Sequence, residues 1–262
     1  MPVDLDPKNN EFNQVSTISF EQLVALGHYS DAQPVNKFGH NEAVGTTRED
    51  IVDNGGAYPW PTAAAAVTVS SSSANDTSAG SGAQTVTVYG LDANYAEIQE
   101  TFTLNGQTGV TSAQSFLRVF RLIVNTAGAT GYNEGDIYCG TGTITTGVPA
   151  VVLGRVLFDT GDNRGENQSL MAIYTVPAGK TLIVANTFVE SSSAKLVEYW
   201  LFARPLGGVF NAKHRGMIIQ SAHDHAFSPP LAFGPKTDIK VCARVGTGTS
   251  DVAAGFGGIL VA

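Results

Sequence analysis

The sequence has few charged residues, two cysteines and no long apolar run. Asp, Glu, Lys and Arg make up 15% of its 262 residues, well below the roughly 25% typical of soluble domains. The net charge of −8 at pH 7 argues against a surface that neutralises phosphates, so we expect neither nucleic acid nor a membrane as a partner. No apolar stretch approaches the ~20 residues of a membrane-spanning helix, and the first residues lack the pattern of a signal peptide.

The two cysteines, Cys139 and Cys242, lie in the strand-like segments DIYCGTG and DIKVCARV. One disulfide between them is arithmetically possible, but a secreted disulfide framework would use more pairs. Buried free thiols are therefore the favoured prediction. This cysteine usage indicates a chain that folds in a reducing cytoplasm.

Glycine, valine and threonine are abundant where charged residues are few, and the sequence contains 29 glycines. These residues suit half-buried strands joined by tight turns and disfavour helical bundles. Short alternating segments with turns every eight to twelve residues or so favour a sandwich or barrel. We therefore predict an all-β fold of two tandem β-sandwich or jelly-roll-like units behind an extended N-terminal arm. The expected boundaries are 1–62 for the arm, 63–148 for the first unit and 149–262 for the second.

The arm has one helix candidate, over residues 19–27. Ser19 fits an N-cap with Gln22 as its capping-box partner, and Gly27 fits a helix end. The rest is irregular but contains aromatic residues, and such side chains need a surface to cover them. We expect Phe38, Tyr58 and Trp60 to be buried interface anchors, against either the β units of this chain or a neighbouring subunit.

Turn signals divide the remainder of the chain. Asn105-Gly106 is typical of a hairpin turn, and the segment 177–180 (PAGK) combines a turn-forming proline with a glycine. A break at Val148-Pro149 marks the predicted start of the second unit. The Ser- and Gly-rich segment over residues 70–82 is expected to be an exposed loop without chemistry.

The best local cluster of reactive side chains is His223-Asp224-His225. On a strand, this spacing places both imidazoles on one face and Asp224 on the other, which is an arrangement found in metal sites. His214 and Glu190 could join them only if the fold brings them near. A polar loop or subunit contact is the favoured interpretation, and a metal shared by subunits around a three-fold axis is the minor alternative. We predict no resident metal.

Other patterns do not predict catalysis or a cofactor. The sequence has no Gly-x-Ser-x-Gly elbow, and Asp159, Asp162 and Glu166 lack the spacing of a calcium loop. Tyr199 and Trp200 could serve with Trp60 as a sugar-binding platform, but their apolar surroundings favour a place in the core or a subunit contact. We therefore expect a protein without enzymatic activity.

Three segments resemble a family of virion proteins of tailed bacteriophages. They are VNKFGHN leading to EDIVDNGGAYPWP (35–41 and 49–61), SANDT through TVTVYGLD and TLNG (73–77, 85–92 and 103–106), and QSLMAIYTVPAGKT (168–181). The middle segment is the more specific, because turns like PAGKT recur in many phage β-sandwich proteins. The resemblance implies a structural component of the particle, located on the virion and assembled in the host cytoplasm.

The expected function is a capsid decoration, or cement, protein that bridges capsid subunits. The expected partners are further copies of the chain, a trimer being favoured, and the major capsid protein or tail proteins. A tail or adaptor component is the close alternative. A carbohydrate- or receptor-binding module, built on the second unit with Tyr199 and Trp200, is the alternative from a different functional class.

Overall fold

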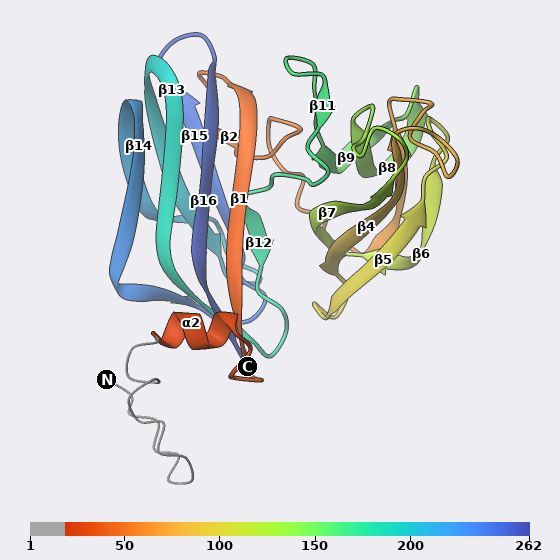
Figure 1. Ribbon diagram of the computed structural model, residues 1–262. Helices are drawn as coiled ribbons and strands as arrows, with labels where there is room; N and C mark the ends of the chain where they lie inside the picture. The colour runs from red at the N-terminus through yellow and green to blue at the C-terminus, as the bar shows by residue number, and fades with distance from the viewer. Residues whose placement is uncertain (1–18) are drawn as a thin grey trace, which may run out of the picture.

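A computed structural model describes residues 19–262 of the chain. The fold is all-β, as predicted, and two bodies built of strands lie side by side (Figure 1). The helix α2 (Phe20–Ala25) lies at one end of the body that contains the C-terminus. Within residues 19–262, no helix is long and apolar enough to cross a membrane.

The first body is a sandwich of a four-stranded and a three-stranded sheet. The four-stranded sheet has the order β6-β3-β8-β9, and the three-stranded sheet has the order β5-β4-β7. Apolar side chains from both sheets form one core, because alternate residues of each strand face inward. The strands are β3 (Ala65–Ser71), β4 (Ala83–Leu91), β5 (Glu97–Thr103), β6 (Val110–Phe116), β7 (Arg118–Ala127), β8 (Ile137–Thr145) and β9 (Val148–Val156).

The second body is one seven-stranded sheet that bends back on itself. Its order is β1-β16-β13-β15-β12, with β14 paired to β13 and β2 paired to β15. Its strands are β1 (Ala32–Val44), β2 (Glu49–Asp50), β12 (Ile173–Thr175), β13 (Thr181–Arg204), β14 (Asn211–Phe233), β15 (Asp238–Val245) and β16 (Ser250–Val261). The short strands β10 (Phe158–Asp159) and β11 (Arg164–Gly165) form a separate hairpin between the bodies (Figure 1).

A bulge in β13 divides this sheet into two layers. Ser191 pairs with Ser221 and Leu196 pairs with Ile219, so residues 192–195 of β13 lie opposite Gln220 alone. Gln220 has a positive φ of 43°, which helps β14 turn at the same point. The first half of β13 pairs with β16 and the second half with β15. A single core lies between the two layers, as in a sandwich whose layers share two continuous strands.

Several local predictions are confirmed. In α2, Ser19 and Gln22 form both hydrogen bonds of the capping box. Gly179 has a φ of 76° and Gly106 a φ of 59°, the left-handed conformation that glycine adopts without steric cost. These features depend on residues close together in the sequence, so the local pattern was sufficient to identify them.

Two predictions about organisation are wrong. The predicted boundary at residue 148 falls between β8 and β9, which pair along most of their length in one sheet. The segment 32–44, expected to be part of an extended and irregular arm, is the strand β1, which pairs antiparallel with β16. This pairing agrees with the expectation that the arm packs against the β units of this chain. The pairing of β1 with β16 joins segments far apart in the sequence, which strand periodicity does not encode. The predicted break at residue 148 instead falls at a hairpin, whose turn at Thr146 and Gly147 joins β8 to β9.

The Ser- and Gly-rich segment over residues 70–82 was expected to be an exposed loop, but the buried carboxylate of Asp76 holds it in place. Asp76 is fully buried, and its oxygens accept hydrogen bonds from the Ser71 hydroxyl (2.6 Å) and from the backbone N–H groups of Ala83, Glu134 and Gly135 (2.7–3.0 Å). The loop is therefore tied to the segment before β8. Burial raises the pKa of Asp76, and the four hydrogen bonds partly offset that shift.

Candidate functional site

A buried ion cluster joins the two bodies. The Arg118 guanidinium on β7 donates from Nε and Nη2 to the two carboxylate oxygens of Asp238 on β15, at 3.1 and 3.2 Å. Arg204 at the end of β13 binds the same carboxylate through Nε at 3.0 Å, and the Thr175 hydroxyl donates to it at 2.6 Å. Because Arg118 and Asp238 are both about 5% exposed, removal of one partner would leave an uncompensated buried charge.

The aromatic anchors Tyr58 and Trp60 lie at this junction. Tyr58 is 2% exposed, and its hydroxyl bridges the backbone N–H and C=O of Val119, each at 3.1 Å. Its ring meets that of Trp60 edge-on, with centroids 4.9 Å apart. Trp60 is half-buried beneath the guanidinium groups of Arg118 and Arg204. The groups that contact both rings belong to this chain, which is one of the two surfaces expected to cover these anchors.

Phe38 on β1 has a different environment. Its side chain is half-buried and lines a hollow of about 480 Å³ together with Phe188 and Glu190 of β13. The neighbouring Lys37 points into the junction, where its ammonium donates to the Phe120 carbonyl at 2.6 Å. Burial, with the nearby charge of Arg121, lowers the pKa of Lys37 well below its usual range. Of the three predicted anchors, Phe38 alone lies at a surface hollow.

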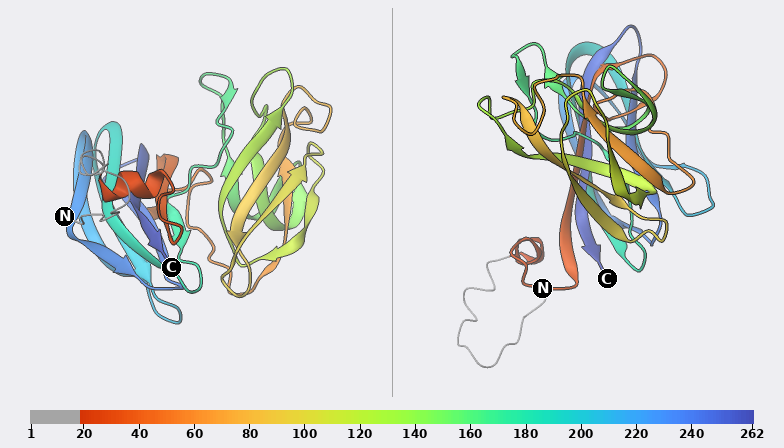
Figure 2. Two further views of the ribbon diagram at one scale, coloured as in Figure 1. Left: turned by 60° about the horizontal axis from the view of Figure 1, so that its bottom comes forward. Right: turned by 90° about the vertical axis from the view of Figure 1, so that its right-hand side faces the viewer.

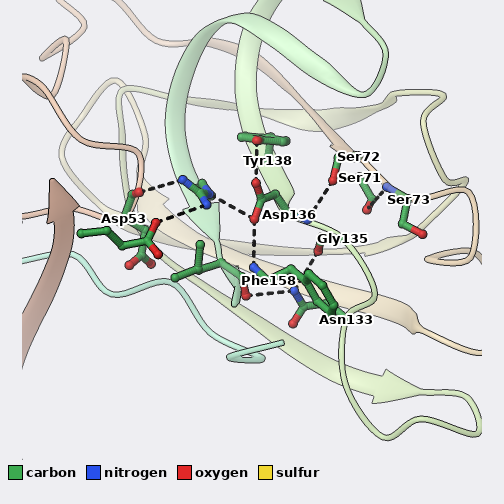
Figure 3. A network of polar contacts seen from close by, with 12 residues as sticks. Asp53, Ser71, Ser72, Ser73, Asn133, Gly135, Asp136, Tyr138 and Phe158 are labelled. Carbon is green, nitrogen blue, oxygen red and sulfur yellow. Dashed lines mark hydrogen bonds and ion pairs between the residues drawn. The ribbon is translucent and has the colours of Figure 1, made fainter. Parts of the chain in front are cut away.

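A polar network connects the N-terminal segment to the first sandwich. Figure 3 shows the Asp136 carboxylate accepting from the Tyr138 hydroxyl at 2.9 Å and from the Phe158 N–H at 2.8 Å. Arg155 pairs with Asp136 at 3.2 Å and donates to the backbone carbonyl of Asp53 at 3.1 Å. The network therefore holds the segment around Asp53 against β8 and β9.

The Asp53 side chain is incompletely paired. One carboxylate oxygen accepts from the Leu170 N–H at 2.5 Å, while the other is buried without a hydrogen bond and lies 4.0 Å from Nδ1 of His40. Burial raises the pKa of Asp53 well above its usual range. On its other side, His40 contacts the exposed Asp251 at 2.7 Å. We therefore expect the stability of the folded chain to depend on the ionisation of Asp53.

The predicted His-x-His pair does gain a third member. Within residues 19–262, the one group of three or more His, Cys, Asp or Glu side chains placed to hold a metal is His214, His223 and His225, whose ligand atoms all lie within 4.8 Å of one another. Asp224 lies on the opposite face, where the Asn186 amide donates to it at 2.9 Å. Glu190 does not join the cluster, because it lines the hollow beside Phe38 instead. Asp159, Asp162 and Glu166 form no such group.

The outer face of the β13–β14 ribbon carries exposed aliphatic side chains. Leu196, Met217 and Ile219 are 38%, 63% and 58% exposed, and Leu196 and Ile219 lie directly opposite each other in the pairing. We call these three residues the aliphatic patch. Beside it, Glu198 pairs with Arg215 and Arg244 at 3.3 and 2.9 Å. Among residues 19–262, β14 pairs with β13 alone.

The burial of the two cysteines and of Tyr199 and Trp200 tests the predictions made for them. Cys139 and Cys242 are free, buried thiols, as predicted. Burial raises the pKa of both, to about 12 for Cys242. Tyr199 and Trp200 are 0% and 5% exposed, so the core interpretation is confirmed and neither ring is available to a sugar. The two rings therefore do not support a carbohydrate-binding module.

Sequence reasoning missed the residues whose partners lie far along the chain. Asp238 and Arg118 are separated by 120 positions, and no local pattern marks either as buried. For Asp76, the one local signal was an aspartate within a serine- and glycine-rich segment, a context in which Asp commonly accepts backbone hydrogen bonds.

Comparison with known proteins identifies no relative of this chain. No protein-family model matches it, and no curated protein matches it significantly. Among solved structures, those of infectious bursal disease virus Gt and Gx strains are 10% and 11% identical and align over 88% and 87% of this chain and 72% and 71% of theirs, each with a TM-score of 0.23. The T=1 particles derived from the same virus give 10% identity, 88% and 69% coverage and the same TM-score. Similarity this low does not establish a shared fold and carries no functional argument.

Proposed function

We propose that this chain is a non-enzymatic structural protein of a tailed-phage virion, and more specifically a decoration protein that bridges capsid subunits. The three sequence segments that resemble phage virion proteins support this proposal. The aliphatic patch is the structural observation that carries it. Exposed aliphatic side chains gathered on one face are typical of a surface that a partner covers.

The composition of this face suits a protein–protein contact. Leu196, Met217 and Ile219 provide apolar area, while the paired charges of Glu198, Arg215 and Arg244 lie beside them. An apolar centre with a polar rim containing arginine is common in protein interfaces. A stable contact would bury about 1,200 Å² or more in total, which requires the patch together with its surroundings.

The junction between the two bodies suits a mechanical role. The buried ion cluster around Asp238 and the rings of Tyr58 and Trp60 fix one sandwich against the other within the same chain. A clamp must transmit force between the surfaces that it joins, and a rigid junction allows this. The partners proposed are copies of the chain, as a trimer, and the major capsid protein.

The direct test is to locate the chain on purified particles. We expect mass spectrometry of particles from the virus that encodes it to detect the chain, and immunogold labelling to place it on the head. Its absence from particles would refute a virion role. Labelling confined to the tail would refute the decoration role and support the tail or adaptor alternative.

A variant tests whether the aliphatic patch is the contact. We expect the double change Met217→Glu with Ile219→Lys to abolish incorporation into particles while the chain still folds. The matched control is Val151→Lys, since Val151 is 43% exposed on a strand of the first sandwich. Normal incorporation of the double variant would exclude the patch as the contact.

A further inference from the structure

Three histidines converge although they lie in two separate parts of β14. His214 is on the first part of the strand, where it pairs with Leu201, and His223 and His225 are on the second part, where they pair with Val189 and Thr187. Leu201, Val189 and Thr187 are all fully buried. Because directly opposite residues of antiparallel strands share a face, all three histidines lie on inner faces of the two layers.

The bend of the ribbon brings these inner faces together at the side of the sandwich. The rings of His214 and His225 stack with centroids 4.1 Å apart and an interplanar angle of 22°. The ring of His223 lies 6.2 Å from that of His225. Phe227 packs its ring against both His214 and His225, at 5.9 and 5.0 Å. The cluster therefore has an apolar wall on one side, while His223 is exposed on the other.

The spacing is close to that of a metal site. The ligand atoms lie within 4.8 Å of one another, whereas a tetrahedral ion with bonds of about 2.0–2.1 Å holds its nitrogen ligands roughly 3.3 Å apart. An imidazole nitrogen binds a metal in the plane of its ring, so the nearly parallel rings of His214 and His225 would have to turn out of their stack to face one ion. The exposed His223 side chain would have to turn toward them.

The net charge of −8 for the chain favours the approach of a cation, and imidazole is the commonest side-chain ligand of transition metals.

Tyr199 positions one of the three rings. Its hydroxyl lies 3.0 Å from Nε2 of His214, so a proton on Nε2 can be donated to the Tyr199 oxygen, which leaves Nδ1 free as a ligand. The Tyr199 ring lies over Gly216, where a Cβ atom would come within 2.4 Å of the ring. Gly216 therefore provides the space that lets the tyrosine reach His214.

We propose that His214, His223 and His225 of a single chain bind one divalent transition-metal ion. Three imidazole ligands suit zinc, nickel or copper and disfavour magnesium or calcium. Three protein ligands leave a fourth position for water or for a side chain of a partner subunit. The site is independent of the proposed virion role, because each isolated chain contains all three ligands.

Metal titration of the untagged full-length chain tests the proposal. We expect calorimetry with Zn²⁺ to give one ion per chain, and Co²⁺ to give the visible absorption of a tetrahedral nitrogen-ligated ion. His214→Ala, His223→Ala and His225→Ala should each weaken binding at least tenfold. Tyr199→Phe keeps the ring and should weaken binding by roughly tenfold. The matched control is His28→Ala, which removes a histidine near α2 and should leave the affinity unchanged.

Three outcomes would overturn the proposal. One is the absence of saturable binding by the folded wild-type chain at 100-fold excess Zn²⁺. Another is unchanged binding by folded His223→Ala and His225→Ala variants, which would place the ion elsewhere. The third is one ion per three chains with no binding by monomers, which would indicate a site on a symmetry axis instead of within a chain. Circular dichroism of each variant separates loss of the ligand from loss of the fold.

Discussion

The two sandwiches bury the apolar faces of their sheets in different ways. In the first, seven separate strands form two sheets that close over one core. In the second, the strands β13 and β14 run continuously through both layers and bend at the bulge near Ser191. The left view of Figure 2 shows the two bodies side by side, and Figure 1 shows the long strands β13 and β14 in the body that contains the C-terminus.

The difference explains where chemistry is found. The interior of the first sandwich is apolar apart from residues such as Asp76 that hold its loops. The bent ribbon of the second leaves an open side, because β14 is an edge strand whose inner faces meet there. That open side carries the three histidines inside and the aliphatic patch outside. The bend in the β13–β14 hairpin thus brings the three histidines together on its inner side, and the aliphatic patch lies on its outer side.

The largest expected effect comes from breaking the junction between the two bodies. Asp238→Ala would leave Arg118 and Arg204 without their carboxylate, and breaking a buried pair in this way costs about 3–5 kcal/mol. The buried thiols report on each body separately, since Cys139 lies in the first and Cys242 in the second. We expect thiol labelling across a urea series to show both cysteines becoming reactive at lower urea concentrations in the variant than in the wild type, because both bodies lose the shared junction.

The control for this change is Asp251→Ala, at a side chain 61% exposed. Loss of an exposed pair costs less than about 1 kcal/mol, so the two thiols should be labelled as in the wild type. Unchanged stability in Asp238→Ala would show that the junction does not hold the bodies together.

The next effect should be confined to the first sandwich. Asp76→Ala leaves three backbone N–H groups and one hydroxyl without their acceptor, which we expect to cost about 2–3 kcal/mol. Cys139 should be labelled at lower urea concentration while Cys242 is unaffected. Asp92→Ala, at a surface turn of the same body, serves as the control. Equal exposure of both thiols would mean that the two sandwiches unfold as one unit.

A smaller, pH-dependent effect is expected at the junction. Burial raises the pKa of Asp53 in the folded protein above its value in the unfolded chain, so folding favours the protonated carboxyl. The stability that this provides is present below the unfolded pKa and is lost as the pH rises through the folded pKa. Asp53→Asn retains an oxygen for the Leu170 N–H and removes the charge.

The gain from Asp53→Asn should therefore be near zero in acid and reach on the order of 1–2 kcal/mol at higher pH. Urea unfolding of both proteins at a series of pH values measures it. Asp251→Asn, at an exposed carboxylate near the same histidine, should show no such rise. A gain that falls with increasing pH would contradict the assignment.

The smallest effect is expected at α2. Ser19→Ala removes the hydroxyl that accepts from the Gln22 N–H at 3.3 Å, and loss of an N-cap costs about 1 kcal/mol. Hydrogen exchange at the Gln22 amide should quicken while both sandwiches keep their protection. Slower exchange, or a global loss of protection, would show that the helix has a different role.

Features set by near neighbours could be predicted from the sequence. The capping box of Ser19 and Gln22, the glycine turn at Gly179 and the buried thiols were all identified correctly, because each depends on a few adjacent residues or on residue type. The pairing of β1 with β16 was not, because the two strands lie at opposite ends of the described residues. The hairpin of β8 and β9 was missed although its turn is local. Strand periodicity indicates which side chains share a face but does not indicate which strand lies beside them.

The candidate site shows the same division. The spacing of His223 and His225 would place both imidazoles on one face if the segment were a strand. The favoured interpretation was a polar loop or subunit contact, and the loop is wrong because the segment lies within β14. Only the bend in β13 and β14 decided that His214 would meet them and that Glu190 would not. The all-β class follows from alternation along each strand, which is local. The site follows from contacts between distant segments, whose geometry is set by the packing of the whole sheet.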